Sequence, residues 1–298
     1  MTTAKQKAWK AKAAEKHAAM AAVVIQLMEE HGTGWLSGLS KLPPPASIAT
    51  GKAYNGSNVA MLTMGAVAYG YVDNRFGTYK GIQAAGGNVR RGERSRLHVV
   101  HFHKRKIERE DKQGNVEEVF LPSLRFYPVF NVSQCDGIPP ISGKDMVERN
   151  ADVDEFINGQ GADIRQGPQP LYSPTEDYIA LPPRGMYKTS GDVTATEAYY
   201  AAALHELGHW TGHSSRLDRD LITGFGTDKY ANEELIAEIC AALTCQHLGT
   251  QATPTPNTAR YLNSWVKQLK DKPETILTAC TKAYKGLEYL TRAEKGSA

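Results

Sequence analysis

The sequence contains no apolar run of the roughly 18 to 20 residues that a membrane-spanning helix needs, which argues against a membrane protein. Its four cysteines form neither a C-x-x-C pair nor a dense framework, so we expect no disulfide scaffold and no cysteine-based zinc site. Internal repeats and long low-complexity tracts are also absent, which excludes a solenoid. The expected protein is globular, makes no membrane contact and lies in a reducing cytoplasm.

The 298 residues are enough for two domains of ordinary size. The net charge is only +3, but it is unevenly distributed. Residues 1–130 carry 19 lysines and arginines against 10 acidic residues, whereas the remainder carries 16 against 22. The basic first part and the acidic second part therefore indicate different electrostatic roles.

The first part of the chain mixes helical and strand patterns. Helical patterns cover residues 1–30 and 58–70, and two β-like runs, 96–107 and 116–132, follow with a charged, glycine-containing turn between them. Proline and glycine then become frequent, which predicts a boundary near Gly143. The predicted fold is α+β with two domains, 1–130 and 144–298, joined by a linker over 131–143.

A long alanine-rich helix is predicted in the second part. It starts after a T-x-x-E capping box, Thr194 to Glu197, and contains the motif "HELGH", residues 205–209. A second helix is predicted over residues 231–249, where Gly249 ends it. The strand-like stretch 177–183 is expected to pair with an extended peptide substrate.

The motif predicts a metal site. His205 and His209 are four residues apart, so they project from one helix face and can bind the same Zn²⁺ ion. Glu206 would lie beside the metal, where a carboxylate can act as the general base. Zn²⁺ is the expected ion, with Mn²⁺ or another divalent metal as the alternative, because metal availability also decides occupancy.

A third ligand is needed, because catalytic zinc sites usually have three protein ligands and one open position. A glutamate on the second helix, about 25 residues downstream, resembles the gluzincin arrangement. We predict that Glu234 is this ligand and that Glu238 hydrogen-bonds a ligating histidine. Glu233 remains the alternative ligand, because helix phase alone does not exclude it.

Tyr230 and His213 are the candidates for stabilising the oxyanion of a tetrahedral intermediate. His213 follows His209 by four residues, not by the six of the metzincin pattern. Gly212 predicts a helix end at that point, which would turn His213 away from the ion.

Basic and aromatic residues together predict a surface for single-stranded nucleic acid. Clustered cations neutralise phosphates regardless of base sequence, and aromatic rings stack on unpaired bases. The alternative is that the cations are merely solvated and the aromatic side chains form core. The residues assigned to this surface are Tyr54, Phe76, Tyr79, Arg90, Arg91, Arg94, Arg96, Lys104 and Arg105.

Three motifs in the first part, Y-x-G-x-N (54–58), T-Y-K (78–80) and G-x-x-V-x-x-G-E (86–93), carry a resemblance to a known family. They resemble the single-stranded-DNA-binding domain of the ArdC antirestriction family, which recurs in plasmid primases of the TraC type. The run "HELGHWTGHSSRL" followed by "YANEELIAEI" is similar to the zincin metallopeptidase domain of the same family. The resemblance spans nearly the whole chain and keeps the domain order.

The resemblance implies an antirestriction protein of conjugative plasmids in the bacterial cytoplasm. It adds Asn58 to the DNA-binding residues, and it implies metal ligation by His205 and His209 with Glu206 as general base. The implied partners are single-stranded DNA and a protein or peptide substrate, such as a restriction-system component or a DNA-bound protein. Phe76 stands near a position where the family commonly has tryptophan, so it is expected to stack only if it faces DNA.

Two alternative functions are compatible with the same motifs. The first is a non-proteolytic DNA-binding shield in which the metal domain is structural. The second is a protease that degrades proteins crosslinked to DNA.

Overall fold

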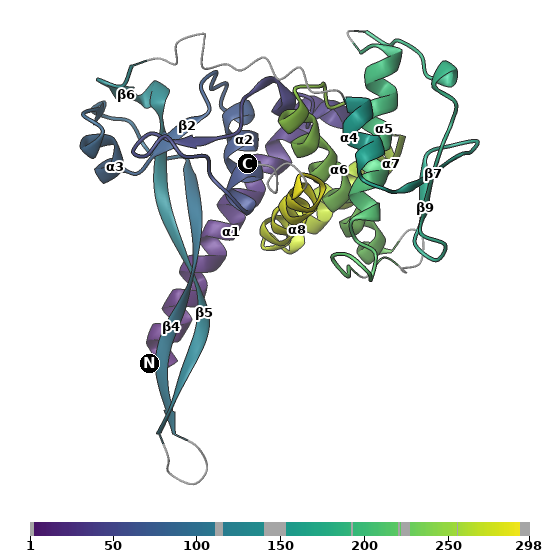
Figure 1. Ribbon diagram of the computed structural model, residues 1–298. Helices are drawn as coiled ribbons and strands as arrows, with labels where there is room; N and C mark the ends of the chain where they lie inside the picture. Colours follow the sequence, from purple (N-terminus) through teal and green to yellow (C-terminus); the bar gives the residue numbers. More distant parts are fainter. Residues whose placement is uncertain are drawn as a thin grey trace.

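The computed structural model describes residues 3–110, 116–139, 153–191, 193–219, 221, 227–254 and 256–292. Figure 1 shows a strand-rich part with a long projecting hairpin beside a helix-rich part. The mixture of helices and sheets confirms the predicted α+β class. Within these ranges, no helix combines the length and the apolar composition that crossing a membrane requires.

The strand-rich part contains a four-stranded sheet with the order β1-β2-β5-β4 and a small sheet that pairs β3 with β6. β1 runs parallel to β2, and the β2–β5 and β4–β5 pairs are antiparallel. Its helices and strands are α1 (Thr3–His31), η1 (Gly32–Gly34), η2 (Leu39–Lys41), β1 (Ala46–Ser47), α2 (Ser57–Ala68), β2 (Arg75–Gly77), α3 (Tyr79–Ala84), β3 (Asn88–Val89), β4 (Leu97–Glu110), β5 (Val116–Asn131), η3 (Val132–Gln134) and β6 (Cys135–Asp136).

The helix-rich part carries a three-stranded sheet with the order β7-β9-β8. Because β9 lies between two partners, it cannot add a peptide strand, and the expectation for residues 177–183 is wrong. The helices and strands are α4 (Val153–Gly159), β7 (Asp163–Gln166), β8 (Leu171–Ser173), β9 (Tyr178–Leu181), η4 (Arg184–Met186), α5 (Ala195–Trp210), α6 (Asp228–Leu248), α7 (Pro256–Asp271) and α8 (Thr275–Leu290).

Local signals set the ends of the two helices that matter most for the site. The Thr194 hydroxyl accepts the Glu197 backbone N–H at 3.2 Å, and the Glu197 carboxylate accepts the Thr194 N–H at 2.8 Å, so the predicted capping box starts α5. α6 ends at Gly249, whose φ of 69° lies in the left-handed region that glycine adopts without strain.

The domain boundary lies later than the predicted start of the linker. Asn131 pairs with Phe76, and Cys135 pairs with Val89, so residues 131–136 belong to the N-terminal sheets. The linker therefore cannot begin at 131. The predicted boundary at Gly143 lies outside the described residues.

The two parts share one hydrophobic core. Buried residues of α1 and α2 form a continuous cluster with buried residues of α5 to α8. Trp35 and Trp265 are both fully buried and make an edge-on ring contact at 6.2 Å. The amide of Gln246 in α6 donates to the carbonyl oxygens of Leu39 and Leu42, at 3.1 and 2.9 Å. The helices that carry the site are therefore fixed against the N-terminal part.

Candidate metal centre

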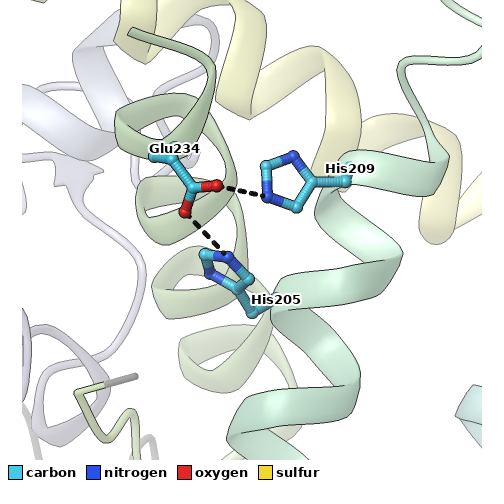
Figure 2. A group of neighbouring side chains, drawn as sticks. All are labelled: His205, His209 and Glu234. Carbon is cyan, nitrogen blue, oxygen red and sulfur yellow. Dashed lines mark ion pairs between the residues drawn. The ribbon is translucent and has the colours of Figure 1, made fainter. Parts of the chain in front are cut away.

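His205, His209 and Glu234 converge between α5 and α6, as Figure 2 shows. Nε2 of His205 is 3.5 Å from Oε2 of Glu234, and Nε2 of His209 is 3.6 Å from Oε1 of the same carboxylate. One potential ligand atom of each residue lies within 4.8 Å of the other two. All three side chains are buried.

The chemistry of this group fits a divalent metal ion. Both ring nitrogens of His205 and Oε2 of Glu234 are buried and make no hydrogen bond to any described residue. Buried polar atoms are normally paired, and an unpaired one is costly. Two imidazoles and one carboxylate form a three-ligand set that leaves a fourth position open, as in catalytic zinc sites. These three residues are the ones that the sequence predicts as ligands.

Close helix packing brings the ligands together. A Cβ atom on Gly208 would lie 3.2 Å from the backbone oxygen of Ala237 and 3.3 Å from its Cα. The glycine between the two histidines therefore lets α5 approach the backbone of α6. This approach places Glu234 opposite the histidine pair.

Charge and burial compete at each group of the centre. Burial opposes ionisation of Glu234, but the neighbouring His205 and His209 rings outweigh it and hold the carboxyl pKa well below its usual range. Burial opposes protonation of His209, but Glu233 and Glu234 raise its pKa to about 10. Burial also raises the pKa of Glu206, although the two histidines offset part of this effect. The cluster therefore favours a cation at its centre.

The two other glutamates of α6 differ from the prediction. Glu233 faces Arg219 and His209, with Oε1 at 3.3 Å from His209 Nδ1, and does not join the three-residue group. Glu238 hydrogen-bonds Thr258, and its Oε2 is 3.9 Å from His205 Nδ1, which is too long for a hydrogen bond. Glu233, not Glu238, therefore hydrogen-bonds a histidine of the centre.

Tyr230 lies beside the centre, whereas His213 does not. Burial, followed by the charge of Glu234 and a hydrogen bond to it, raises the pKa of the Tyr230 hydroxyl. α5 ends before His213, as predicted from Gly212. Nδ1 of His213 hydrogen-bonds the Ser215 hydroxyl at 2.8 Å. It is 3.8 Å from Asp177, in a separate polar cluster. The structure therefore offers no contact between His213 and the metal ligands.

Tyr187 is a neighbour of the site that the sequence does not reveal. Its hydroxyl is buried and makes no hydrogen bond to a described residue, and its ring contacts the Tyr199 ring edge-on at 5.5 Å. Burial, Tyr199 and Glu206 raise its pKa to about 12. No motif or spacing marks this tyrosine, because it reaches Glu206 only through the packing of η4 on α5.

Three residues assigned to DNA are used by the fold. The Tyr54 hydroxyl donates to the Phe76 carbonyl at 3.1 Å. The Asn58 amide donates to the Val100 carbonyl at 2.9 Å and accepts the Val100 N–H at 2.7 Å, which joins α2 to β4. Phe76 is completely buried, so the condition for a stacking role is not met.

The cations around residue 90 form an ordered loop. Arg90 donates to the carbonyl oxygens of Ser133 and Cys135, and Glu93 accepts a hydrogen bond from Gln134 at 2.9 Å. This network fixes the loop that carries three further exposed arginines, Arg91, Arg94 and Arg96. The assigned residues that are exposed are Tyr79, Arg90, Arg91, Arg94, Arg96 and Lys104, although Arg90 is held by its hydrogen bonds within the loop. The side chain of Arg105 lies outside the described part of the chain.

Of the exposed aromatic residues on the hairpin, Phe102 lies among the aromatic residues that the sequence places beside the basic cluster, whereas Phe120 and Tyr127 are not predicted to contact DNA. Phe102 of β4 and Phe120 of β5 are 59% and 58% exposed, and Tyr127 of β5 is 40% exposed. Figure 1 shows that the hairpin projects from the body. The sequence does not predict that these rings are exposed, because side chains alternate between two faces both in a half-buried strand and in a strand that projects into solvent.

Two families match the chain in consecutive ranges. Residues 14–130 match the family described as the N-terminal domain of anti-restriction factor ArdC, and residues 151–282 match the family described as zincin-like metallopeptidase. Two Escherichia coli proteins named DNA primase TraC are 35% and 37% identical to the chain, each over 88% of it, and the chain spans only 25% and 18% of their lengths.

Relatives of similar length also match. An uncharacterized Sinorhizobium fredii protein, y4eC, is 35% identical over 84% of this chain and 81% of its own length. The metal-free crystal structure of the antirestriction ArdC protein from plasmid R388 is 34% identical and covers 94% of this chain and 98% of its own, with a TM-score of 0.71. The Mn(II)-bound structure of that protein is 35% identical and covers 92% and 96%, with a TM-score of 0.70.

Proposed function

Because the chain belongs to the ArdC antirestriction family, we propose that it binds single-stranded DNA through its N-terminal part and hydrolyses peptide bonds at the metal centre. The observation that carries the proposal is the convergence of His205 and His209 of α5 with Glu234 of α6. Glu206, the residue after His205 in α5, is buried beside them. Zn²⁺ or Mn²⁺ is the proposed ion, and the Mn(II)-bound relative supports the second.

The chain supplies most of the groups that peptide hydrolysis needs. A bound divalent cation would supply Lewis-acid polarisation of the scissile carbonyl and would lower the pKa of the attacking water. The Glu206 carboxylate would take a proton from that water and pass it to the leaving amine. Tyr230 would position Glu234 through its hydrogen bond and is the remaining candidate for contact with the oxyanion.

The proposed DNA surface consists of the start of α3, the loop after β3 and the hairpin of β4 and β5. Arg91, Arg94 and Lys104 are exposed there and can neutralise phosphates, and Tyr79 offers an exposed ring on which a base can stack. The exposed ring of Phe102, two residues before Lys104 and so on the same face of β4, extends this surface along the hairpin. Binding through such contacts would depend strongly on salt and little on base sequence.

Joining both activities in one chain suggests the substrate. A DNA-bound protein, for example a component of a restriction system, would have a high effective concentration at the peptidase site once the same strand is held. In this way the protein would protect incoming DNA from restriction.

The test separates hydrolysis from binding. We expect Glu206→Gln to lower peptidase activity about 10²- to 10⁴-fold, because the proton acceptor is lost, while metal content and affinity for single-stranded oligonucleotides stay unchanged. His205→Ala should lose the metal as well, and His31→Ala, at an exposed histidine, is the matched control. Activity is measured on casein and on a protein attached to a single-stranded oligonucleotide.

Antirestriction is measured with the same variants during DNA transfer into restricting cells. Protection that persists in Glu206→Gln would support the non-proteolytic shield and contradict a need for hydrolysis. Degradation of the attached protein alone, with casein intact, would favour a crosslink protease.

A further inference from the structure

Arg219 is a buried arginine that holds the C-terminal end of the helix carrying the histidines. After α5 ends, the chain turns back, and the Arg219 backbone N–H donates to the Gly212 carbonyl at 2.8 Å. The guanidinium donates from Nη2 to the Gly208 carbonyl at 2.6 Å and from Nη1 to the Thr211 hydroxyl at 2.9 Å. A cation is favourable at this end of a helix, where carbonyl groups lack partners.

The same guanidinium binds Glu233. Nη2 lies 2.8 Å from Oε1, and Nε lies 3.1 Å from Oε2, so the two groups meet in a bidentate fork. Oε1 of Glu233 is also 3.3 Å from Nδ1 of His209. A continuous series of contacts thus runs from Arg219 through Glu233 and His209 to Glu234.

We propose that Arg219 is a positioning residue for the metal centre, acting through Glu233 on His209. Glu233, held by Arg219, accepts the Nδ1–H of His209 and thereby selects the tautomer whose Nε2 is free to bind a metal. This inference rests on the metal centre of the proposed function.

The neighbouring groups explain why an arginine is needed. Glu233 and Glu234 are adjacent on α6 and both buried, so Glu233 requires a fixed cation to stay away from the ligand position. Lysine offers no planar fork and could not hold both carboxylate oxygens in one geometry. His205 has no equivalent, because Glu238 is too far from its Nδ1 to hydrogen-bond it.

Gly212 fits the same arrangement. A Cβ atom at this position would lie 2.7 Å from Cζ and Nη2 of Arg219, so the guanidinium would have to shift from its hydrogen bonds. The glycine therefore makes room for the guanidinium.

The test compares Arg219→Met with Arg216→Met. Arg216 lies in the same loop and its side chain is 8% exposed. It donates to the Trp210 carbonyl at 2.6 Å and pairs with Asp177, and no hydrogen bond or ion pair of the described residues joins it to a proposed metal ligand or to Glu233. Affinities for Zn²⁺ and for Mn²⁺ are measured by chelator competition at one pH. We expect Arg219→Met to weaken metal binding about 10- to 100-fold, Arg219→Lys to recover only part of this loss, and Arg216→Met to match the wild type.

Equal affinity in Arg219→Met and the wild type would overturn the proposal, and so would an equal loss in Arg216→Met. A wild-type chain that binds neither metal would instead overturn the proposed function, and the inference with it.

A second measurement does not depend on a variant that folds. In the zinc-loaded wild type with ¹⁵N-labelled histidine, His209 should show a protonated Nδ1 and a metal-bound Nε2, and Glu233→Gln should shift the Nδ1 signal of His209 more than any signal of His205. An unprotonated or metal-bound Nδ1 on His209 would contradict the proposal.

Discussion

Glu233 and Glu234 are neighbours in the sequence but contact different groups, and helix geometry explains the difference. Successive residues of an α-helix point about 100° apart. Glu234 therefore points between the two histidines, whereas Glu233 points past His209 toward Arg219. Which of the two glutamates can serve as the metal ligand therefore depends on which side of α6 packs on α5.

Asp177 offers a separate test at the level of a single ion pair. The hydrogen bonds from Arg216, and to a lesser extent from Tyr172, hold the pKa of Asp177 below its usual range although burial acts in the opposite direction. Because the pKa is lower in the folded chain, the pair stabilises the fold above the ordinary carboxyl pKa, and this contribution is lost as the pH falls through the depressed value. The stabilisation is thus fully present at pH 7.

We expect Asp177→Asn to lower the free energy of unfolding by about 1 kcal/mol at pH 7, since the pair is partly exposed. Asparagine tolerates the positive φ of 54° at this position, so the backbone is not a confounding factor. Urea unfolding at several pH values measures the difference, which should narrow from pH 7 toward pH 3. A difference independent of pH would contradict the electrostatic explanation.

The ends of helices and the location of the hairpin could be predicted because local residues decide them. The Thr194 capping box and Gly249 fix α5 and α6 through hydrogen bonds within one turn. The central place of β9 and the complete burial of Phe76 could not be predicted, because both depend on partners distant in the sequence. The same applies to Arg219, which no regular spacing relates to Glu233.

The contact between α5 and α6 yields a prediction about Gly208. Alanine there would press on the Ala237 backbone, which can move only with α6. Overpacking costs about 1 to 3 kcal/mol, and the helix propensity of alanine returns up to about 1 kcal/mol. We therefore expect Gly208→Ala to destabilise the fold by about 1 kcal/mol and to weaken metal binding.

Thermal unfolding and chelator competition measure the two effects of Gly208→Ala. Gly159→Ala is the control, because a Cβ atom on Gly159 meets nothing within 4 Å. It should leave metal binding unchanged and should not lower stability. Unchanged metal affinity in Gly208→Ala would mean that the distance between the helices does not limit the centre.

The shared core links the candidate metal centre to the N-terminal part. α6 carries Glu234 near its start and Gln246 near its end, where the amide bonds the η2 region. The sequence predicts two domains with a linker, and two families do match the two ranges, but the packing of α1 and α2 on α7 and α8 joins them. Motifs reveal domains, whereas packing between them leaves no local pattern.

This connection predicts that metal binding stabilises both parts together. At a metal concentration about 1,000 times Kd, the free energy of opening should rise by about 4 kcal/mol, in β4 and β5 as well as in α5 and α6. Hydrogen exchange of the backbone amides, with and without metal, measures this rise. His205→Ala should show none, and protection confined to α5 and α6 would contradict a single cooperative unit.

The burial of Trp35 against Trp265 also has a consequence for inheritance. A recombination event that separated the two parts would expose the aromatic surface of each, and exposed apolar surface of this kind promotes aggregation. The unit that can pass intact from one gene to another is therefore the joined pair. Both Escherichia coli primases match it as a pair, over 88% of this chain.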